Sequence, residues 1–404
     1  LPEQHDWAAK NQRQAGIFNE TLAATGYGDG GGGANAEMCE RVRRQADLAG
    51  VPRTKWGKIS DFFDRLHDVR DQLPTWHGEM YVEFHRGVQT THGHLKAAYR
   101  AAERGLQLHE AAAALTGKSG PTDDAWQRVV FAQFHDYLPG SSIQEVYDEG
   151  VPELQGIADE ATSAAKRLVE GGDTDCLFNA LPMERTQLVE GKCVKLPPLS
   201  VTAIAQAETI EAPAVELHGS ADAPTLSNGR VQATFDAAGC VTRFVVDGHA
   251  IPLAGPANQL YILPDHPAAY PAWDIDRPAM SLGQPTTGPA TQSSDGSDAR
   301  RTLSFTRKLG HSSTATVRYI LEVGSPVLKV EVDVDWHESN TVLKAAWPTK
   351  YNAREARYGS PFGSTMRAQI GDTATDESRF ENPLSRWMCL SDESGGDGIM
   401  LLTE

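Results

Sequence analysis

The spacing of apolar residues predicts helices in the first 172 residues and strands in the rest of the chain. In the stretches 36–48, 60–73, 94–115 and 123–136, apolar side chains recur at the interval typical of amphipathic helices. From about residue 173, β-branched runs alternate with polar residues and are separated by Gly, Pro, Asn and Asp. This second pattern predicts an all-β region of antiparallel strands.

The predicted strands are clearest in three alternating runs, 301–309, 314–323 and 327–336. The segment 286–301 is rich in Thr, Ser, Gly and Asp and is predicted to be a surface loop.

Polar residues at the helix starts are candidates for N-caps. Asn35 precedes the helix at 36–48, and Ser60 opens the next one. Ser142 and Glu145 match the S-x-x-E capping box, which predicts a third long helix after the Pro-Gly corner. The apolar stripes expected to face a core are Phe63, Leu66 and Val69, then Leu95, Ala98, Tyr99, Leu106 and Leu108, and finally Trp126, Val129, Val130 and Phe134.

These elements divide the chain into three parts. Residues 1–74 combine short helices with a Gly-rich loop, residues 75–172 fit a three-helix bundle, and residues 173–404 fit a large antiparallel β-sandwich. A chain of 404 residues is long enough for two or three domains. The predicted fold class is therefore a multidomain α+β protein.

Charge, hydropathy and cysteine content limit the classes of partner and the compartment that fit this sequence. A formal net charge of −17 argues against nucleic acid, because a phosphate backbone attracts basic surfaces. No apolar run approaches the roughly 20 residues of a membrane-spanning helix. The five cysteines are scattered without a C-x-x-C pair, which favours a reducing compartment. Because the first residue is Leu1 and not Met, we expect the natural N-terminus to lie upstream, out of view.

The Gly-rich loop raises the question of a nucleotide site. Gly28, Gly30 and Gly33 satisfy G-x-G-x-x-G, but a run of four glycines produces this match by chance. No acidic residue or G-K-[ST] follows at the required place, so a nucleotide site is disfavoured. The glycines instead predict backbone with positive φ or a close approach, with Asp29 among them as an ordinary turn former.

Histidine and arginine residues lie around the predicted start of the helix at 94–115. Alternation through 80–84 predicts an extended segment that leads to Arg86. His92 and His94 are two residues apart and would not face each other on a helix. We therefore expect them to be solvated residues at a helix start and not a pair of metal ligands.

His135 and Asp136 lie at the predicted C-terminal end of the helix 123–136. The helix dipole favours a histidine at that end but not an aspartate, so a capping role explains only half of the pair. Ionisable groups in unfavourable positions often mark functional sites. A plain helix end remains the alternative interpretation.

Several stretches resemble, in the same order, the signatures of the class II α-mannosidases, glycoside hydrolase family 38. They are GYGDGGGG at 26–33, GEMYVEFHRGVQTTHGHLK at 78–96 and AWQRVVFAQFHDYLPGSSIQEVYDE at 125–149. LFNALPMERTQLV, LYILPDHPAAYPAWDID, YNAREARYGSPFGSTMR and SRWMCLSDESGGDGIMLL resemble segments of the family's β-sandwich. The Gly-rich loop is more similar to the cytosolic and bacterial branch than to the Golgi or lysosomal one.

The resemblance implies a retaining, metal-dependent hydrolase of terminal non-reducing α-D-mannose in oligosaccharides, acting in mannose metabolism or glycan degradation. It implies a (β/α)7 catalytic barrel with residues 1–74 as its C-terminal remnant, followed by the bundle at 75–172 and the sandwich at 173–404. The implied cofactor is Zn²⁺, or another divalent ion such as Co²⁺, with one ion per complete site. The implied compartment is the cytoplasm, and a homo-oligomeric state stays open.

The family's functional residues carry over to matching positions of this sequence. His135 corresponds to a metal ligand and Asp136 to a residue that contacts the substrate sugar. The acidic loop carries the general acid/base in relatives, which makes Asp29 the candidate here. Arg86 and Tyr27 are candidates for substrate binding.

The sequence also departs from the family pattern. The family's nucleophilic aspartate and its other metal ligands belong to barrel strands that would precede Leu1, and His5 and Asp6 do not match their spacing. Gln89 stands where relatives carry an aromatic residue. We therefore expect a chain truncated at both ends, and we expect the 404-residue chain alone to bind metal weakly and to show no turnover.

Two other functions are compatible with the sequence. The first is a non-catalytic carbohydrate-binding or scaffold protein that keeps the bundle and the sandwich. The second is a hydrolase of similar architecture that acts on a different sugar.

Overall fold

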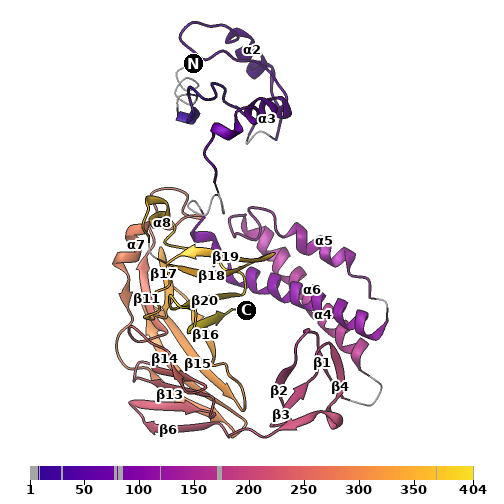
Figure 1. Cartoon of the computed structure of the whole chain (residues 1–404), viewed down its shortest axis with the longest axis vertical. Coiled ribbons are helices and arrows are strands. Elements are labelled where there is room, and N and C mark those ends of the chain that lie inside the picture. The colour runs from indigo at the N-terminus through magenta and orange to yellow at the C-terminus, as the bar shows by residue number, and fades with distance from the viewer. Residues whose placement is uncertain are drawn as a thin grey trace. The chain divides into compact units, whose positions relative to one another are not determined.

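The computed structural model describes residues 8, 10–28, 31–76, 80, 85–118, 120–170, 175–369 and 371–403. The chain divides into two compact units, Leu1–Glu79 and Met80–Glu404, and Figure 1 labels many of their helices and strands. Within the described ranges, no helix is both long and apolar enough to cross a membrane.

The first unit contains the helices α2 (Ala36–Arg44) and α3 (Ile59–His67) and the 3-10 turn η1 (Arg70–Gln72). Asn35 caps α2 as predicted, because its side-chain oxygen accepts a hydrogen bond from the Met38 N–H at 2.9 Å. The prediction for Ser60 is wrong, since α3 begins at Ile59 and Ser60 lies in its first turn.

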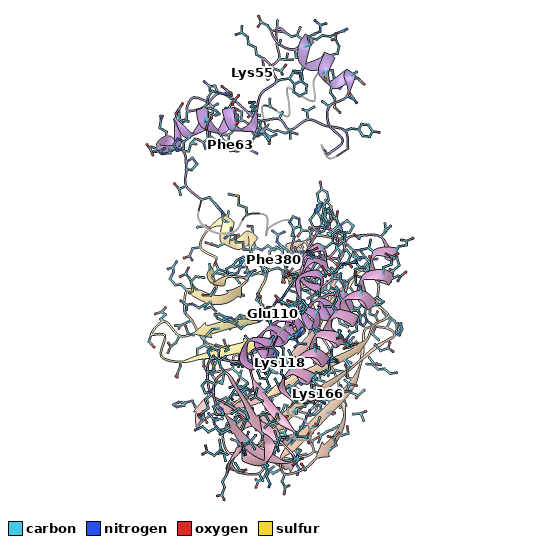
Figure 2. The ribbon with its side chains drawn as sticks, turned by 90° about the vertical axis from the view of Figure 1, so that its right-hand side faces the viewer. Lys55, Phe63, Glu110, Lys118, Lys166 and Phe380 are labelled. Atoms are coloured by element: carbon cyan, nitrogen blue, oxygen red, sulfur yellow. The ribbon has the colours of Figure 1, made fainter. Side chains whose placement is uncertain are left out.

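Two members of the predicted stripe, Leu66 and Val69, are half-buried, whereas the third, Phe63, is exposed and Phe62 packs in its place. Phe62 packs edge-on against Phe18, with the ring centroids 5.6 Å apart. Phe63, labelled in Figure 2, is 52% exposed. The expectation that this unit is part of a catalytic barrel stays a prediction.

The second unit opens with the 3-10 turn η3 (Gly87–Gln89) and three helices, α4 (Gly93–Thr116), α5 (Asp123–Phe131) and α6 (Gln144–Val169). The helices share one core, which includes Leu95, Leu106, Val129, Leu154 and Ala158. Glu110 on α4, labelled in Figure 2, accepts hydrogen bonds from the Thr122 hydroxyl and the Trp126 indole, each at 2.6 Å. These bonds fix the start of α5 against α4.

Close helix contact explains a glycine inside α4. A Cβ atom at Gly105 would lie 3.0 Å from the Ala158 carbonyl oxygen of α6. Glycine thus lets the backbones of the two long helices approach each other here.

The end of α5 and its apolar stripe differ from the predictions. The helix predicted to reach residue 136 ends at Phe131. Val129 is buried as expected, but Val130 and Phe134 are each 58% exposed. The chain leaves the helix after Phe131, so residues beyond it no longer follow the helical stripe.

The predicted capping box is also wrong. The third helix begins at Gln144, and Ile143 occupies the cap position without a side-chain hydrogen bond. The Ser142 N–H instead donates to the Tyr147 hydroxyl at 2.6 Å, so Ser142 and Glu145 do not cap each other. The Tyr147 hydroxyl, one turn into the helix, thus accepts the backbone N–H that the capping box was expected to satisfy.

The change from helices to strands falls between Val169 and Cys176, and the described strands pair antiparallel, as predicted. The largest sheet has the order β10-β9-β8-β7-β6, and a four-stranded sheet has the order β13-β14-β15-β16. Their strands are β6 (Glu216–Ser220), β7 (Ala223–Ser227), β8 (Val231–Phe235), β9 (Val241–Val246), β10 (His249–Ala250), β13 (Thr291–Gly296), β14 (Arg300–Leu309), β15 (Ser313–Glu322) and β16 (Lys329–Asp335).

Four smaller sheets complete the β region, with the orders β12-β11-β17, β19-β18-β20-β21, β2-β3-β5 and β1-β4. Their strands are β1 (Cys176–Asn179), β2 (Arg185–Val189), β3 (Lys192–Leu196), β4 (Ser200–Ala203), β5 (Glu208–Ile210), β11 (Gln259–Pro264), β12 (Gln284–Pro285), β17 (Thr341–Ala346), β18 (Glu355–Ser360), β19 (Gly363–Ala368), β20 (Trp387–Ser391) and β21 (Gly398–Leu402). Short helical turns between them are η4 (Ile204–Gln206), α7 (Arg277–Leu282) and α8 (Ala374–Ser378).

The loop predicted at 286–301 is wrong in its second half. Residues Thr291–Gly296 form β13, which pairs with β14 along its whole length. All six residues of β13 are exposed, so the strand has no hydrophobic alternation to reveal it.

One core joins the five-stranded sheet with the sheet that contains β14 and β15. The rings of Phe235, Phe305 and Tyr319 meet in it, with centroids 4.4 to 6.1 Å apart. The buried Tyr319 hydroxyl donates to the Gly239 carbonyl at 2.7 Å and accepts from the Asn258 side chain at 2.8 Å. The Tyr319 hydroxyl therefore has both a donor and an acceptor as partners inside the core.

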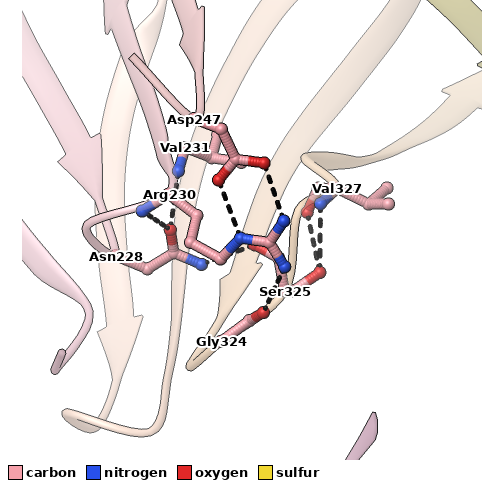
Figure 3. Close-up of polar contacts among 7 residues, drawn as sticks. All are labelled: Asn228, Arg230, Val231, Asp247, Gly324, Ser325 and Val327. Atoms are coloured by element: carbon pink, nitrogen blue, oxygen red, sulfur yellow. Dashed lines mark hydrogen bonds and ion pairs between the residues drawn. The ribbon is translucent and has the colours of Figure 1, made fainter. Parts of the chain in front are cut away.

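A buried asparagine holds the β7–β8 turn against the loop after β15 (Figure 3). The Asn228 amide donates to the Glu322 and Ser325 carbonyls, and its oxygen accepts from the N–H groups of Arg230 and Val231. Asn228 is 0% exposed, and these four hydrogen bonds use the full bonding capacity of its side chain within the protein.

Candidate active-site turn

Residues 132–143, which we call the His-Asp turn, connect α5 with α6. Three successive turn hydrogen bonds shape its first half, from Phe134 N–H to Phe131, from Tyr137 N–H to Phe134 and from Gly140 N–H to Tyr137, at 2.9 to 3.1 Å. His135 is consequently not a helix residue, and its side chain is 73% exposed. The helix-dipole argument for this pair does not apply, because α5 ends four residues before His135.

His135 and Asp136 face each other at the surface. The His135 Nε2 atom lies 3.4 Å from Asp136 Oδ2, and the imidazole also leans on the Phe134 ring, with centroids 4.3 Å apart. Asp136 Oδ1 accepts a hydrogen bond from the Ser141 hydroxyl at 2.9 Å. One carboxylate oxygen is thus held by the turn, and the other is turned toward the exposed imidazole.

A lysine from α4 fixes the second half of the turn. The Lys96 ammonium donates to the carbonyl oxygens of Leu138 at 2.9 Å, Pro139 at 3.4 Å and Thr91. Burial lowers the pKa of Lys96 to about 8, because desolvation penalises the charged form. The backbone directly after Asp136 is therefore anchored to the first turns of α4.

A tyrosine from α6 closes the other side. Tyr147 is 5% exposed and stacks on the His92 ring, with centroids 4.0 Å apart. Its hydroxyl accepts from the Ser142 N–H and donates to the Asp136 carbonyl at 3.4 Å. His92, which begins α4 with a left-handed φ of 52°, is therefore a packing partner of the turn.

Two glycines are required by this packing. Gly140 has a φ of +93°, and a Cβ there would lie 2.9 Å from a Thr91 methyl group. At Gly150 a Cβ would lie 1.8 Å from the Tyr137 hydroxyl oxygen. The shape of the turn thus depends on the absence of side chains at both positions.

Arg86 has its guanidinium engaged within the protein. It forms two hydrogen bonds with Asp274, at 2.9 and 3.1 Å, and donates to the Ser378 carbonyl. It also lies over the ring of Phe380, which Figure 2 labels. These contacts join the start of the second unit to its β region, whereas the predicted role of Arg86 in substrate binding stays a prediction.

The remaining candidates belong to the first unit. Asp29 lies outside the described residues. Tyr27 is 71% exposed, and its backbone closes the Gly-rich loop by a hydrogen bond to the Gly33 carbonyl at 2.8 Å. Gly28 and Gly33 have φ values of +66° and +72°, which confirms the prediction of positive φ in this loop. The extended segment predicted at 80–84 lies almost wholly outside the described residues.

The described residues contain no group of three or more His, Cys, Asp or Glu side chains arranged to hold a metal ion. The assignment of His135 as a zinc ligand therefore stays a prediction. The residues that sequence reasoning missed are Lys96 and Tyr147, whose contacts with the turn span 42 and 11 positions of the chain. The sequence offers one signal for the Lys96 contact, a lysine near the start of an Ala-rich helix.

Comparison with known families gives three consecutive matches. The model of the glycosyl hydrolases family 38 N-terminal domain matches residues 3–79. The alpha mannosidase middle domain matches 83–170, and the glycosyl hydrolases family 38 C-terminal domain matches 226–404.

Relatives match over nearly the whole chain. Human alpha-mannosidase 2C1 is 28% identical over 98% of this chain and 41% of the human protein. The Saccharomyces cerevisiae alpha-mannosidase is 26% identical over 97% of this chain and 39% of the yeast protein. The chain thus spans about two fifths of the length of these relatives.

A solved structure supports the fold. The alpha-mannosidase from Enterococcus faecalis V583 superposes with a TM-score of 0.59 at 13% identity, covering 88% of this chain and 55% of that one. Together, the three family models and the relatives show that the chain belongs to glycosyl hydrolase family 38.

Proposed function

We propose that the natural gene product that carries this sequence hydrolyses terminal non-reducing α-D-mannose residues of oligosaccharides. The observation that carries the proposal is the exposed His135 imidazole beside the Asp136 carboxylate, on a turn anchored from two helices. Family membership and the names of the relatives supply the sugar and the linkage type.

We also propose that His135 is a ligand of Zn²⁺, or of another divalent ion such as Co²⁺. An exposed neutral imidazole is the ligand these ions bind most often in proteins. A zinc site needs several protein ligands, and His135 is the one that we propose in this chain. We accordingly propose that the 404-residue chain by itself binds zinc weakly and shows no turnover.

The proposed mechanism is hydrolysis with retention at the anomeric carbon. Such an enzyme uses two carboxyl groups about 5–5.5 Å apart, one as nucleophile and one as general acid/base. Asp29 is the proposed acid/base, and Arg86 and Tyr27 remain proposed substrate contacts. A bound zinc ion would polarise sugar hydroxyl groups as a Lewis acid.

Asp136 is suited to orient the mannose ring. Its Oδ1 atom is already fixed by the Ser141 hydroxyl, so the carboxylate cannot rotate freely. Its Oδ2 atom remains directed outward beside His135, where it can accept a hydrogen bond from a sugar hydroxyl. The Ser141 bond thus preorganises the group for substrate.

The test is hydrolysis of p-nitrophenyl α-D-mannopyranoside by the natural gene product, with the β-anomer as control. We expect turnover of the α-anomer alone and at least a roughly 100-fold lower kcat/KM for Asp136→Asn. Binding of mannosides without hydrolysis would identify a carbohydrate-binding protein and contradict the proposal. Normal turnover by the 404-residue chain would refute the proposed inactivity of that chain.

A cytoplasmic location is also proposed. All five cysteines are free, and Cys193 and Cys240 are buried, which suits a reducing compartment. Fractionation of the source cells tests this, and recovery of the protein outside the cytoplasm would contradict it.

A further inference from the structure

The ring of Trp273 stacks with two other aromatic rings of the second unit, one from a neighbouring residue and one from a distant segment. The rings of His85 and Trp273 are 5.3 Å apart at 26°, and those of Tyr270 and Trp273 are 5.8 Å apart at 19°. We call these three residues the aromatic ladder. Trp273 is half-buried, whereas Tyr270 at the end of the ladder is 64% exposed. The fold thus holds a large, flat aromatic side chain in solvent.

The orientation of Tyr270 is fixed by its backbone. Its φ is 52°, in the left-handed region that bulky residues rarely adopt. Its carbonyl accepts hydrogen bonds from the N–H groups of Trp273 at 2.8 Å and Asp274 at 3.0 Å, which close a tight turn. A non-glycine residue in this conformation is strained, and such residues cluster at ligand sites.

The ladder and the His-Asp turn both contact the segment that precedes and opens α4. The Gly87 N–H donates to the Trp273 carbonyl at 2.8 Å, and a Cβ at Gly87 would lie 3.1 Å from the Trp273 carbonyl carbon. Four residues later, the Thr91 hydroxyl bonds the Gly87 carbonyl at 2.7 Å, and Thr91 packs against Gly140 of the turn. The segment 85–96 therefore contacts both the ladder and the His-Asp turn.

The charges around the ladder indicate what can stack on it. The carboxylate of Asp274 is neutralised by Arg86, and Asp276 accepts a hydrogen bond from the Ala268 N–H. The net charge of −17 on the chain disfavours nucleotides, whose bases would otherwise stack on such a ring. A neutral pyranose has an apolar C–H face that an exposed aromatic ring buries well, and a hydroxyl rim that carboxylates bind.

We propose that Tyr270 is a stacking platform for a sugar residue of the glycan, at a position separate from the mannose that is cleaved. The proposal rests on the proposed function for its class of ligand. Trp273 stacks on Tyr270 and also on His85, and Arg86 holds the segments of Trp273 and His85 together through Asp274. Tyr270 is therefore a specificity-determining residue, and its loss affects long glycans more than short mannosides.

The test measures binding of α-linked mannotriose to the 404-residue chain by calorimetry, which needs no hydrolysis. Tyr270→Asn removes the ring, and asparagine tolerates the left-handed backbone, so the fold is preserved. Tyr270→Phe keeps the ring, and Phe362→Ala removes a fully exposed aromatic residue of the β18–β19 turn as the matched control. Thermal unfolding of each variant checks the fold.

We expect Tyr270→Asn to weaken mannotriose binding about 3- to 10-fold, with wild-type affinity for the other two variants. In the natural gene product, the same variant should raise KM for mannotriose by a similar factor and leave kcat for p-nitrophenyl α-D-mannopyranoside unchanged. Equal binding by wild type and Tyr270→Asn, or no binding by either, would overturn the proposal. Binding that depends on Tyr270 in a protein without hydrolysis would support the platform and reject only the proposed function.

Discussion

Replacing Gly150 by alanine tests how Tyr137 packs behind the His-Asp turn. Gly150 lies in α6, where alanine ordinarily gains about 1 kcal/mol over glycine in helix propensity. Here the new Cβ would lie 1.8 Å from the Tyr137 hydroxyl oxygen and 2.6 Å from its Cζ atom. Contacts this short cannot persist, so the Tyr137 ring must leave its place, two residues after His135.

The expected loss of stability in Gly150→Ala is obtained by comparison with a second glycine of the same helix. Gly156 is also in α6 and has no atom within 4 Å of its would-be Cβ, so Gly156→Ala should raise the free energy of unfolding by about 1 kcal/mol. Gly150→Ala receives the same propensity gain but carries an overpacking cost of about 1–3 kcal/mol. The difference between the two variants isolates that cost.

The assay is urea unfolding followed by the helical circular dichroism signal at 222 nm. We expect Gly150→Ala to be less stable than Gly156→Ala by about 1–3 kcal/mol. Tyr137→Leu in the Gly150→Ala background should recover part of this loss, because the shorter side chain no longer reaches the new Cβ. Equal stability of the two glycine variants would refute the packing described for Tyr137 and with it the shape of the turn.

Three further changes probe the core and the charged groups. Tyr319→Phe should lower the free energy of unfolding by about 1–3 kcal/mol in urea titrations, because it leaves the buried Asn258 amide and the Gly239 carbonyl without their partner. The pKa of Lys96 is lowered from 10.5 to about 8, so the unfolded chain binds more protons between these values, and stability should rise with pH across this window. Thermal melts of Lys96→Met should lack that rise. The N–H groups of Ser312 and its neighbours hold the pKa of Glu338 below its usual 4.5, so its stabilising contribution is complete above that pH and is lost as the pH falls further. Acid titration of Glu338→Gln should show a correspondingly weaker loss of stability.

The long strands were predictable because their burial alternates. In β14 and β15, inward apolar residues such as Leu303 and Val317 recur at every second position, which is the period of a half-buried strand. The exposed strand β13 was missed, because it is held only by backbone pairing with β14 and has no apolar face. Such a strand looks like a polar loop to any method that reads hydrophobic spacing.

Helix ends were less predictable where distant residues decide them. The apolar spacing continues past Phe131, but the chain turns away at that point and is held by the Lys96 ammonium and the Tyr147 hydroxyl. The Lys96 contact spans 42 positions of the chain, so the end of α5 could not be inferred from nearby residues. The Tyr147 hydroxyl is only five positions from Ser142, but capping rules consider side chains at fixed offsets and do not include this bond. Propensity and capping rules were overridden by tertiary contacts.

The candidate site was partly visible in the sequence. The His135–Asp136 pair stood out by its position and by its resemblance to a family signature, and the two side chains do lie together on the surface. The engagement of Arg86 with Asp274, 188 positions away, could not be read from either segment alone. Long-range ion pairs of this kind leave no local pattern.

The most direct test of the account is the metal content of the natural gene product that carries these residues. Zinc is measured by mass spectrometry after dialysis, in wild type, in His135→Ala and in His94→Ala, which replaces an exposed histidine of α4 as control. We predict about one zinc ion per chain in wild type and His94→Ala, and loss of zinc together with α-mannoside hydrolysis in His135→Ala. Full zinc occupancy and normal hydrolysis in His135→Ala would contradict the central claim that the His-Asp turn contributes to the active site.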